Sequence, residues 1–289
     1  MEKHQELIDR IYEAPFQPHL WKDVLQDISD IAGARGGILS GPSIIPNGFL
    51  FSDSILPVVE VMVADKFVRG RALEAELLKL RHPAFVSDAC AFDEDKKAKT
   101  PIYSEIMWPQ GIGHSAGTHV RTTMGESLMF WLMRSRDKGP VPQESLNELT
   151  ALRPHLARAV TLSARNEFQQ IQNANRALAA AGLAAAAVSS TGRIIDCNPL
   201  FSSLDEQVVI SGHDRLRLAH ASANSILDES LESARYDFGD VATASRSLAL
   251  PATDTASAAV LHLIPARGIL RDLFRHTAFF VIITPLGQV

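Results

Sequence analysis

Residues 142–181 have the sequence PQESLNELTALRPHLARAVTLSARNEFQQIQNANRALAAA, and this stretch decides how the chain is organised. Its apolar residues recur every three or four positions, with polar Asn175 filling the one gap: Leu149, Leu152, Leu156, Val160, Ala164, Phe168, Ile171 and Leu178. From 149 to 178 there are 29 residues in eight steps, about 3.6 residues a step, which is the period of one helix face. The stretch therefore predicts a long helix with one buried stripe, dividing the chain into two halves.

Pro154 interrupts this pattern. It has no backbone N–H and would clash with the carbonyl of Thr150, so we expect a kink there, or two helices that meet. The stripe alone fits two interpretations. One is a packed core helix, and the other is a connector that carries a conformational signal and pairs with a second copy of itself.

Composition sets the outer limits. A chain of 289 residues suggests two domains, and 46% hydrophobic with 21% charged residues is typical of globular proteins. A net charge of −5 excludes a global basic field for nucleic acid. The two cysteines, Cys90 and Cys197, match no metal spacing and favour free thiols in a reducing cytoplasm. No secretory signal and no membrane-spanning run is found, so we expect a soluble, cytoplasmic protein.

The N-terminal half alternates between helical and strand patterns. These patterns predict helices before Pro15 and over 18–32, a strand at 36–40, and a hairpin in 43–51 around Pro46-Asn47-Gly48. They also predict helix in more than one piece over 58–80, a charged surface loop or turn at 93–99, and paired strands at 118–121 and 127–134. This order predicts an α+β domain built on an antiparallel sheet.

The glycine-rich segment GIGHSAG, residues 111–117, resembles a phosphate-binding loop only superficially. It lacks GK[ST], and Ala116 stands where GxGxxG requires glycine, so we interpret it as a hairpin or loop. His114 and His119 with Glu105 or Cys90 could hold a metal. Nothing in the sequence fixes their spacing, and ordinary core or surface histidines are the alternative.

The C-terminal half begins with a strand, a tight turn at Thr191-Gly192, a second strand, and a helix opened by Asn198-Pro199. A short apolar segment at 216–218, a helix over 224–234 and strands at 245–250, 258–264 and 278–284 follow. Two strands, helices and three strands are the connectivity of a PAS-like domain, a five-stranded antiparallel sheet with helices on one face. Cys197 has no cationic neighbour in the sequence, which favours an inert buried thiol over a redox sensor or a flavin-reactive thiol.

Five segments together resemble a known family. They are HPAFVSDACAF (82–92), PIYSEIMWPQGIGHSAGT (101–118), GPV (139–141), LRPHLARAVTLSAR (152–165) and AGLAAAAVSSTGRIIDCNPLFSSL (181–204). The set is similar to the sensory region of bacterial LuxR-type helix-turn-helix transcription regulators, in which a GAF-like and a PAS-like domain precede the DNA-binding domain. The resemblance implies a GAF-like domain over 1–141, a connecting helix over 142–181 and a PAS-like domain over 182–289.

One departure from that family matters. Its helix-turn-helix would begin about where this sequence ends, because only residues 285–289 follow the last predicted strand. We therefore expect either the sensory region of a longer regulator or a protein without the DNA-binding end. The spacing of Trp and Asp typical of the branch that binds acyl-homoserine lactones is not evident, so no ligand is named.

The resemblance implies a ligand-sensing and dimerisation region that passes a small-molecule or protein signal to a DNA-binding domain. The expected partners are a small molecule of unknown identity, a second copy bound through the 142–181 helix, and DNA only through the absent domain, with no membrane. The sequence does not indicate whether a cofactor is bound. One alternative is a stand-alone protein that heterodimerises with full-length relatives. Another is a hydrolase using His114 or His119, although no GxSxG, HExxH, P-loop or paired-cysteine motif is present, and we expect no enzyme and no catalytic or metal residue.

Candidate ligand residues follow from position. In the first domain they are the aromatic and histidine residues beside the predicted sheet, namely Trp108, His114 and Trp131. In the PAS-like domain the resemblance implies a cavity between sheet and helices, where Phe201, Leu204, Leu227 and His262 would lie. Plain core packing is the alternative for each of them.

Overall fold

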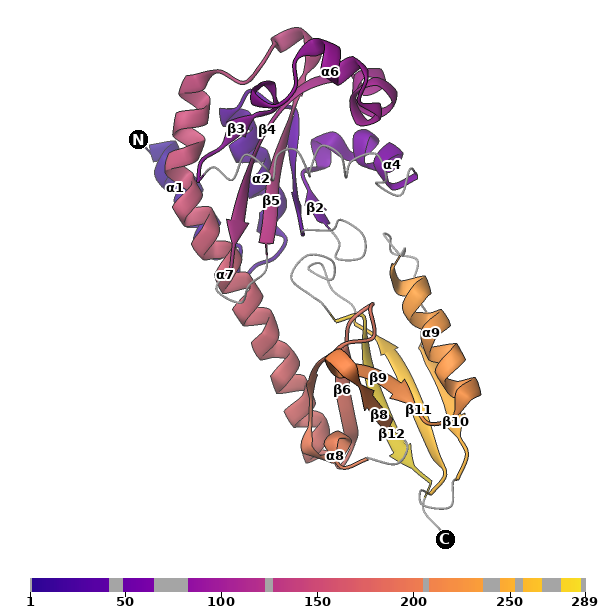
Figure 1. Ribbon diagram of the computed structural model, residues 1–289. Helices are drawn as coiled ribbons and strands as arrows, with labels where there is room; N and C mark the ends of the chain where they lie inside the picture. The colour runs from indigo at the N-terminus through magenta and orange to yellow at the C-terminus, as the bar shows by residue number, and fades with distance from the viewer. Residues whose placement is uncertain are drawn as a thin grey trace. The chain divides into compact units, whose positions relative to one another are not determined.

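The computed structural model describes residues 2–41, 49–64, 83–122, 127–204, 208–235, 245–252, 257–266 and 277–286. It contains two compact units, Met1–Arg165 and Asn166–Val289. Each unit holds a five-stranded antiparallel sheet, and one long helix, α7 (Gln143–Ala180), contributes to both (Figure 1). The predicted α+β class with two antiparallel sheets joined by a long helix is confirmed.

Helix α7 is a single element of 38 residues. Leu149, Leu152 and Leu156 of the predicted stripe are fully buried, and Asn175, the polar member, is 2% exposed. The alternative of two helices meeting at Pro154 is wrong, because the helix continues through it. Pro154 lies on the exposed side of α7, where the carbonyl that loses its intrahelical bond can turn to water.

The first unit combines short helices with the first sheet. Its helices are α1 (Glu2–Glu13), α2 (Leu20–Ile31), α4 (Leu56–Ala64) and α6 (Glu94–Ala98), with the single turns η1 (Asp53–Ile55), η2 (Asp88–Cys90), η4 (Trp108–Gln110) and η5 (Arg136–Lys138) and the π-helical η3 (Ile102–Met107). Its strands are β1 (Gly36–Ser40), β2 (Phe49–Phe51), β3 (Val86–Ser87), β4 (Ile112–Arg121) and β5 (Ser127–Ser135), in the spatial order β2-β1-β5-β4-β3. The predicted strands at 36–40, 118–121 and 127–134 are therefore confirmed.

Helices α2 and α7 cover one face of this sheet. The ring of Trp21 in α2 lies 6.3 Å from that of Phe130 in β5, and its Nε1 donates to Ser163 of α7 over 3.2 Å. Arg153 of α7 donates from Nε to Thr118 Oγ1 in β4 over 3.0 Å. Both helices carry an apolar stripe, and this stripe is buried by packing against the sheet. The two hydrogen bonds then fix the position of α7 against α2 and β4.

Two predictions in this unit are wrong. Residues 112–117 form the first half of β4, not a hairpin or loop. The glycine at 117 serves close strand pairing and not a turn, because a Cβ there would lie 2.8 Å from the carbonyl oxygen of Phe130. Residues 94–98 form α6 and not a charged surface loop. Asp93 caps α6 by accepting from the Lys96 N–H over 2.7 Å, and Lys97 is buried.

Two other predictions fall partly outside the described residues. Strand β2 pairs antiparallel with β1, Leu50 opposite Leu39, as a hairpin would require, but the predicted turn at Pro46-Asn47-Gly48 lies outside them. Of the predicted helix over 58–80, the described part is α4, and residues 65–80 lie outside.

The second unit has its own sheet and core. Its elements are β6 (Ala184–Val188), β7 (Ile194–Cys197), α8 (Pro199–Ser202), β8 (Val208–Ser211), η6 (Gly212–Asp214), β9 (Arg215–Leu218), α9 (Ala221–Arg235), β10 (Arg246–Leu250), β11 (Ala259–Pro265) and β12 (Phe279–Pro285). The five predicted strands are confirmed, in the order β10-β11-β12-β6-β7. The predicted tight turn is present too, with Gly192 at φ 81°. The β8–β9 hairpin was not predicted beyond an apolar segment at 216–218.

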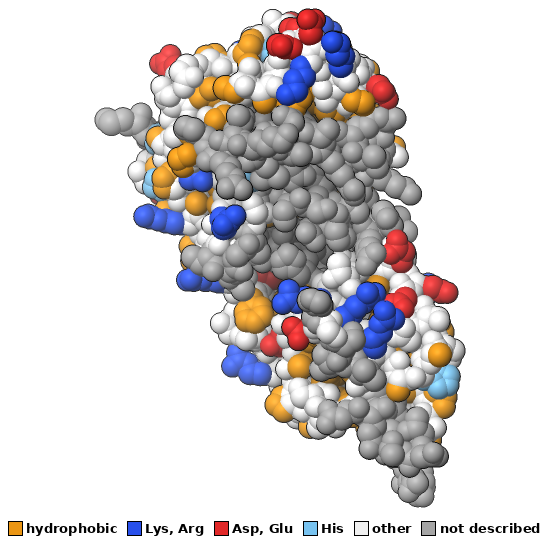
Figure 2. Space-filling model, in the orientation of Figure 1, with side chains coloured by type: hydrophobic (Ala, Val, Ile, Leu, Met, Phe, Trp, Pro, Cys, Tyr) orange, Lys and Arg blue, Asp and Glu red, His pale blue; other side chains and the backbone are white. Residues whose placement is uncertain are grey.

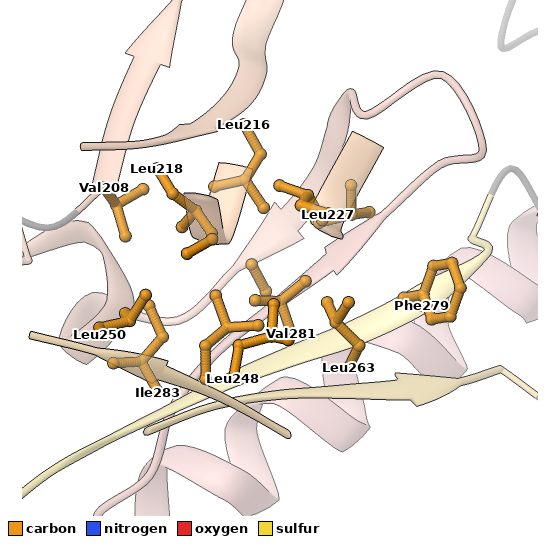
Figure 3. Close-up of a cluster of buried hydrophobic side chains, with 14 of the residues drawn as sticks. Val208, Leu216, Leu218, Leu227, Leu248, Leu250, Leu263, Phe279, Val281 and Ile283 are labelled. Carbon is orange, nitrogen blue, oxygen red and sulfur yellow. The ribbon is translucent and has the colours of Figure 1, made fainter. Parts of the chain in front are cut away.

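A hydrophobic core lies between the second sheet and the β8–β9 hairpin with α9 (Figure 3). Leu248, Leu263 and Val281 of the sheet face Leu216 and Leu227 from the other side. Successive residues of a strand point to opposite faces of the sheet, so every second residue of each strand contributes to this core.

Charged side chains of both signs lie among the described residues on the face that Figure 2 shows. This agrees with the small net charge of −5. Within the described residues, no helix combines the length and the apolar character needed to span a membrane.

Candidate functional site

Three polar side chains lie on one face of the first sheet, the face opposite α2 and α7. In the register, Met129 of β5 pairs with Ser40 of β1 on one side and with His119 of β4 on the other. Trp131 lies two residues from Met129 on the same strand, so it points to the same face. We call Ser40, His119 and Trp131 the polar row.

The side-chain polar atoms of the row are buried and lack hydrogen-bond partners among the described residues. Ser40 is 1% and Trp131 2% exposed, and in the described part of the chain no partner exists for Ser40 Oγ, Trp131 Nε1 or either ring nitrogen of His119. An unsatisfied buried polar group costs about 1–3 kcal/mol, and native proteins leave few of them. Three on one face of adjacent strands make this face a candidate for contact with a bound molecule.

The polar row is electrically neutral at physiological pH. Burial, and after it the positive charge of Arg153, lowers the pKa of His119. Arg153 approaches from the other side of the strand, where its Nη2 donates to the backbone oxygen of His119 over 2.7 Å. A neutral imidazole offers one donor and one acceptor, Ser40 offers both, and the Trp131 indole offers a donor only.

The polar row has apolar neighbours on the same face of the sheet. Ile38 and Met129 share this face and are 0% and 2% exposed. Gly117 pairs with Trp131 and projects no side chain beside the indole. A face of this kind, apolar with a few convergent polar groups, is typical of small-molecule sites.

A second group of buried polar side chains has all of its bonds made. Asp88 accepts from Tyr103 Oη at 2.6 Å and from Ser115 Oγ at 3.1 Å, and it lies 3.3 Å from Lys97 Nζ. Lys97 also donates to the backbone oxygen of Gly113 at 3.0 Å. We call these residues, together with His114, the charged network. It ties η2, α6 and η3 to β4.

Burial shapes the protonation of this network. Burial, and then the charge of Asp88, raises the pKa of Tyr103, so its hydroxyl keeps the proton that it donates to Asp88. Burial, and then the charge of Lys97, lowers the pKa of His114. The neutral ring then accepts from Lys97, whose Nζ lies 3.2 Å from His114 Nδ1. The network satisfies its own groups, as a buried ion pair must to persist.

The candidate residues of the first unit fall into three different contact sets. Trp131 belongs to the polar row, and His114 belongs to the charged network. Trp108, in η4, stacks against Arg136: the guanidinium carbon Cζ lies 4.3 Å from the centroid of the indole ring. Ser40 was not among the predicted ligand residues, and His119 was considered only for metal binding or hydrolysis. Ser40, His119 and Trp131 come together only through the pairing register of β1, β4 and β5, and no pattern of neighbouring residues in the sequence specifies that register.

The candidate residues of the second unit divide between the two faces of its sheet. Phe201 and Leu227 are buried in the core, with Leu204 packed against it. His262 points to the other face, where its Nδ1 lies 2.9 Å from Ser247 Oγ. Leu261 and Leu263 occupy the core positions of β11, so alternation places His262 away from the other three.

The metal alternative finds no support in the described residues, which contain no group of three or more His, Cys, Asp and Glu able to hold an ion. His114 pairs with Arg134 and His119 with Met129, and these partners point to opposite faces of β5. Cys90 and Cys197 are free thiols. The prediction of a buried thiol at Cys197 is wrong, because this side chain is only partly buried and lines a groove at the surface of the second unit.

Comparison with known proteins gives little. No family model matches the chain, and no curated protein matches it. Twelve chains of solved structures match. One of them, from the crystal structure of the E.coli DhaR(N)-DhaL complex, has 10% identity and a TM-score of 0.29, covering 98% of this chain and 88% of that chain. A similarity at this level gives no argument about function.

Proposed function

We propose that this chain is the ligand-sensing and dimerisation region of a LuxR-type transcription regulator, and that its first unit binds a small molecule over the polar row. The observation that supports this proposal is the set of unpartnered polar atoms on Ser40, His119 and Trp131, all on one sheet face. A ligand that supplies hydrogen bonds there removes a penalty that the free protein carries.

The route from this face to α7 is short. The imidazole ring of His119 is part of the polar row, and the backbone oxygen of the same residue accepts a hydrogen bond from Arg153 of α7. A ligand that shifts β4 therefore acts on α7 through Arg153. For this to work as a signal, the protein needs two states with different ligand affinities. In the proposal α7 also pairs with a second copy, and a DNA-binding domain receives the signal.

The proposal assigns binding and not catalysis to this chain. The hydrolase alternative needs a histidine that acts as a base. His114 uses Nδ1 to accept from Lys97, inside the charged network. His119 has no hydrogen-bonded nucleophile among the described residues, because neither ring nitrogen has a partner there.

Native mass spectrometry of protein purified from its own cells tests the proposal, because it reports the mass of the dimer and of any retained small molecule together. We expect the wild type to retain a small-molecule adduct that Trp131→Phe and His119→Gln lose. Trp108→Phe is the matched control, because Trp108 Nε1 is also buried without a partner in the described residues, but Trp108 contacts Arg136 and is outside the polar row. A wild type without adduct, or an adduct kept equally by Trp131→Phe, would contradict the proposal.

A further inference from the structure

A separate polar groove lies within the second unit, between the last turns of α7 and the junction of β7 with α8. Its volume is about 310 Å³, which suits a small ligand. The residues that line it are Gln169, Gln172, Asn175, Arg176, Ala179, Asp196, Cys197, Asn198 and Pro199. It is distinct from the polar row, which belongs to the first unit.

Asn175, one of the residues that line this groove, carries a buried and unused acceptor. The side chain is 2% exposed, and its Nδ2 donates to Asp196 Oδ2 over 2.6 Å, which fixes the orientation of the amide. The amide oxygen, Asn175 Oδ1, has no hydrogen-bond partner among the described residues. A buried amide oxygen left in this way favours a ligand that donates to it.

The base of the groove is held rigidly by Asn198, which is 3% exposed. Its Nδ2 donates to the backbone oxygens of Asn175 at 3.2 Å and Leu183 at 2.9 Å. Its Oδ1 accepts from the backbone N–H of Ala185 at 3.2 Å and of Phe201 at 3.0 Å. Every polar group of this side chain is thus engaged, so the groove is preorganised before any ligand binds.

The groove carries one charge of each sign. Asp196 supplies a carboxylate next to the Asn175 amide, and exposed Arg176 supplies a guanidinium. Arg176 donates from Nη2 to Asn173, and a guanidinium has five N–H donors, so others remain for a ligand. A ligand with a single charge would meet a like charge in the groove, whereas a zwitterion meets a partner at both ends.

We propose that this groove binds a free α-amino acid with a small uncharged side chain. Its ammonium group donates to the Asp196 carboxylate and to Asn175 Oδ1, and its carboxylate accepts from Arg176. Its side chain lies along Ala179 and Pro199, the apolar residues of the lining. The amino acid thus spans α7 and the β7–α8 junction.

Cys197 supplies a reporter for this site, because it lines the groove and the chain has only two cysteines. The rate of alkylation by iodoacetamide at each cysteine is followed by mass spectrometry in the full chain. With about 10 mM L-norvaline and a Kd of about 1 mM, mass action predicts a roughly tenfold slower reaction at Cys197. Cys90, exposed in the first unit, is the internal control and keeps its rate.

Two probes of matched size test whether both charges are needed. Butylamine lacks the carboxylate of norvaline, and pentanoate lacks its ammonium group, so we expect each to protect Cys197 much less than norvaline does. Arg176→Gln removes the guanidinium and should abolish protection. Arg158→Gln, which replaces another exposed arginine of α7 outside the groove, should keep it.

Three results would overturn the proposal: protection by norvaline of less than about twofold, equal protection by either single-charge probe, or full protection in Arg176→Gln. Asp196→Asn is a second variant for the ammonium end. Arg176 is exposed, so we expect Arg176→Gln to fold normally. The test therefore still works if Asp196→Asn, which disturbs a hydrogen bond from buried Asn175, fails to fold. None of these results bears on the polar row.

Discussion

The polar row and the charged network bury polar side chains in the same sheet, with opposite outcomes. In the charged network, buried Asp88, Lys97 and Ser115 meet one another, and their bonds are made inside the protein. In the polar row, Ser40 and Trp131 are equally buried, and their polar atoms have no hydrogen-bond partner in the described part of the chain. Self-satisfied groups contribute to the fold, whereas unsatisfied groups weaken it and are expected where something binds.

The largest expected effect is in the charged network. Lys97→Met leaves the buried Asp88 without its cation, and we expect the free energy of unfolding to fall by about 3–5 kcal/mol in urea titrations. Lys99→Met, two residues on and exposed, is the control and should cost less than about 1 kcal/mol. Pairing Lys97→Met with Asp88→Asn should recover part of the loss. If Lys97→Met alone has an effect as small as that of the control, the network does not stabilise the fold.

Two serines on the same sheet face sharpen the comparison. Ser115→Ala removes a hydrogen bond to Asp88 and should lower the free energy of unfolding by about 1–3 kcal/mol. Ser40→Ala removes an unpartnered hydroxyl and should leave stability unchanged or raise it by about 1 kcal/mol in ligand-free protein. Chemical denaturation of both variants in one buffer measures the difference. Equal losses would show that Ser40 is an ordinary core residue.

The smallest expected effect is on the pH dependence of stability, to which both regions contribute. The folded state lowers the pKa of His114 and of His119 below the ordinary value. As pH falls through about 6.5, the unfolded chain binds protons at these histidines before the folded chain does. The contribution of these two histidines to the free energy of unfolding is therefore complete above that pH. It is lost as the pH falls toward their lowered pKa values in the folded state.

Urea titrations between about pH 5 and pH 8 measure this slope. Replacing His114 or His119 by glutamine should each flatten it, and His220→Gln at the surface is the control for losing any histidine. If the slope is unchanged in both variants, the two rings are not held neutral by burial.

The local pattern predicted much of the fold and little of the candidate site. The period of α7 and the strands of both sheets were predicted because each is a repeat within a few residues. The loop predicted for 111–117 was wrong because glycine is common both in turns and where strands approach closely. Lys97 was expected at the surface because its partner, Asp88, belongs to a different element.

The sequence by itself determined the two halves, the long helix between them, and which of its faces is buried, because hydrophobic period is written into neighbouring residues. Only the tertiary structure decided that Ser40, His119 and Trp131 share a face, and that Asn175, Arg176 and Asp196 line one groove. Both depend on contacts between segments far apart in the chain. A shift of one residue in the register of a strand would place its member of the polar row on the opposite face of the sheet.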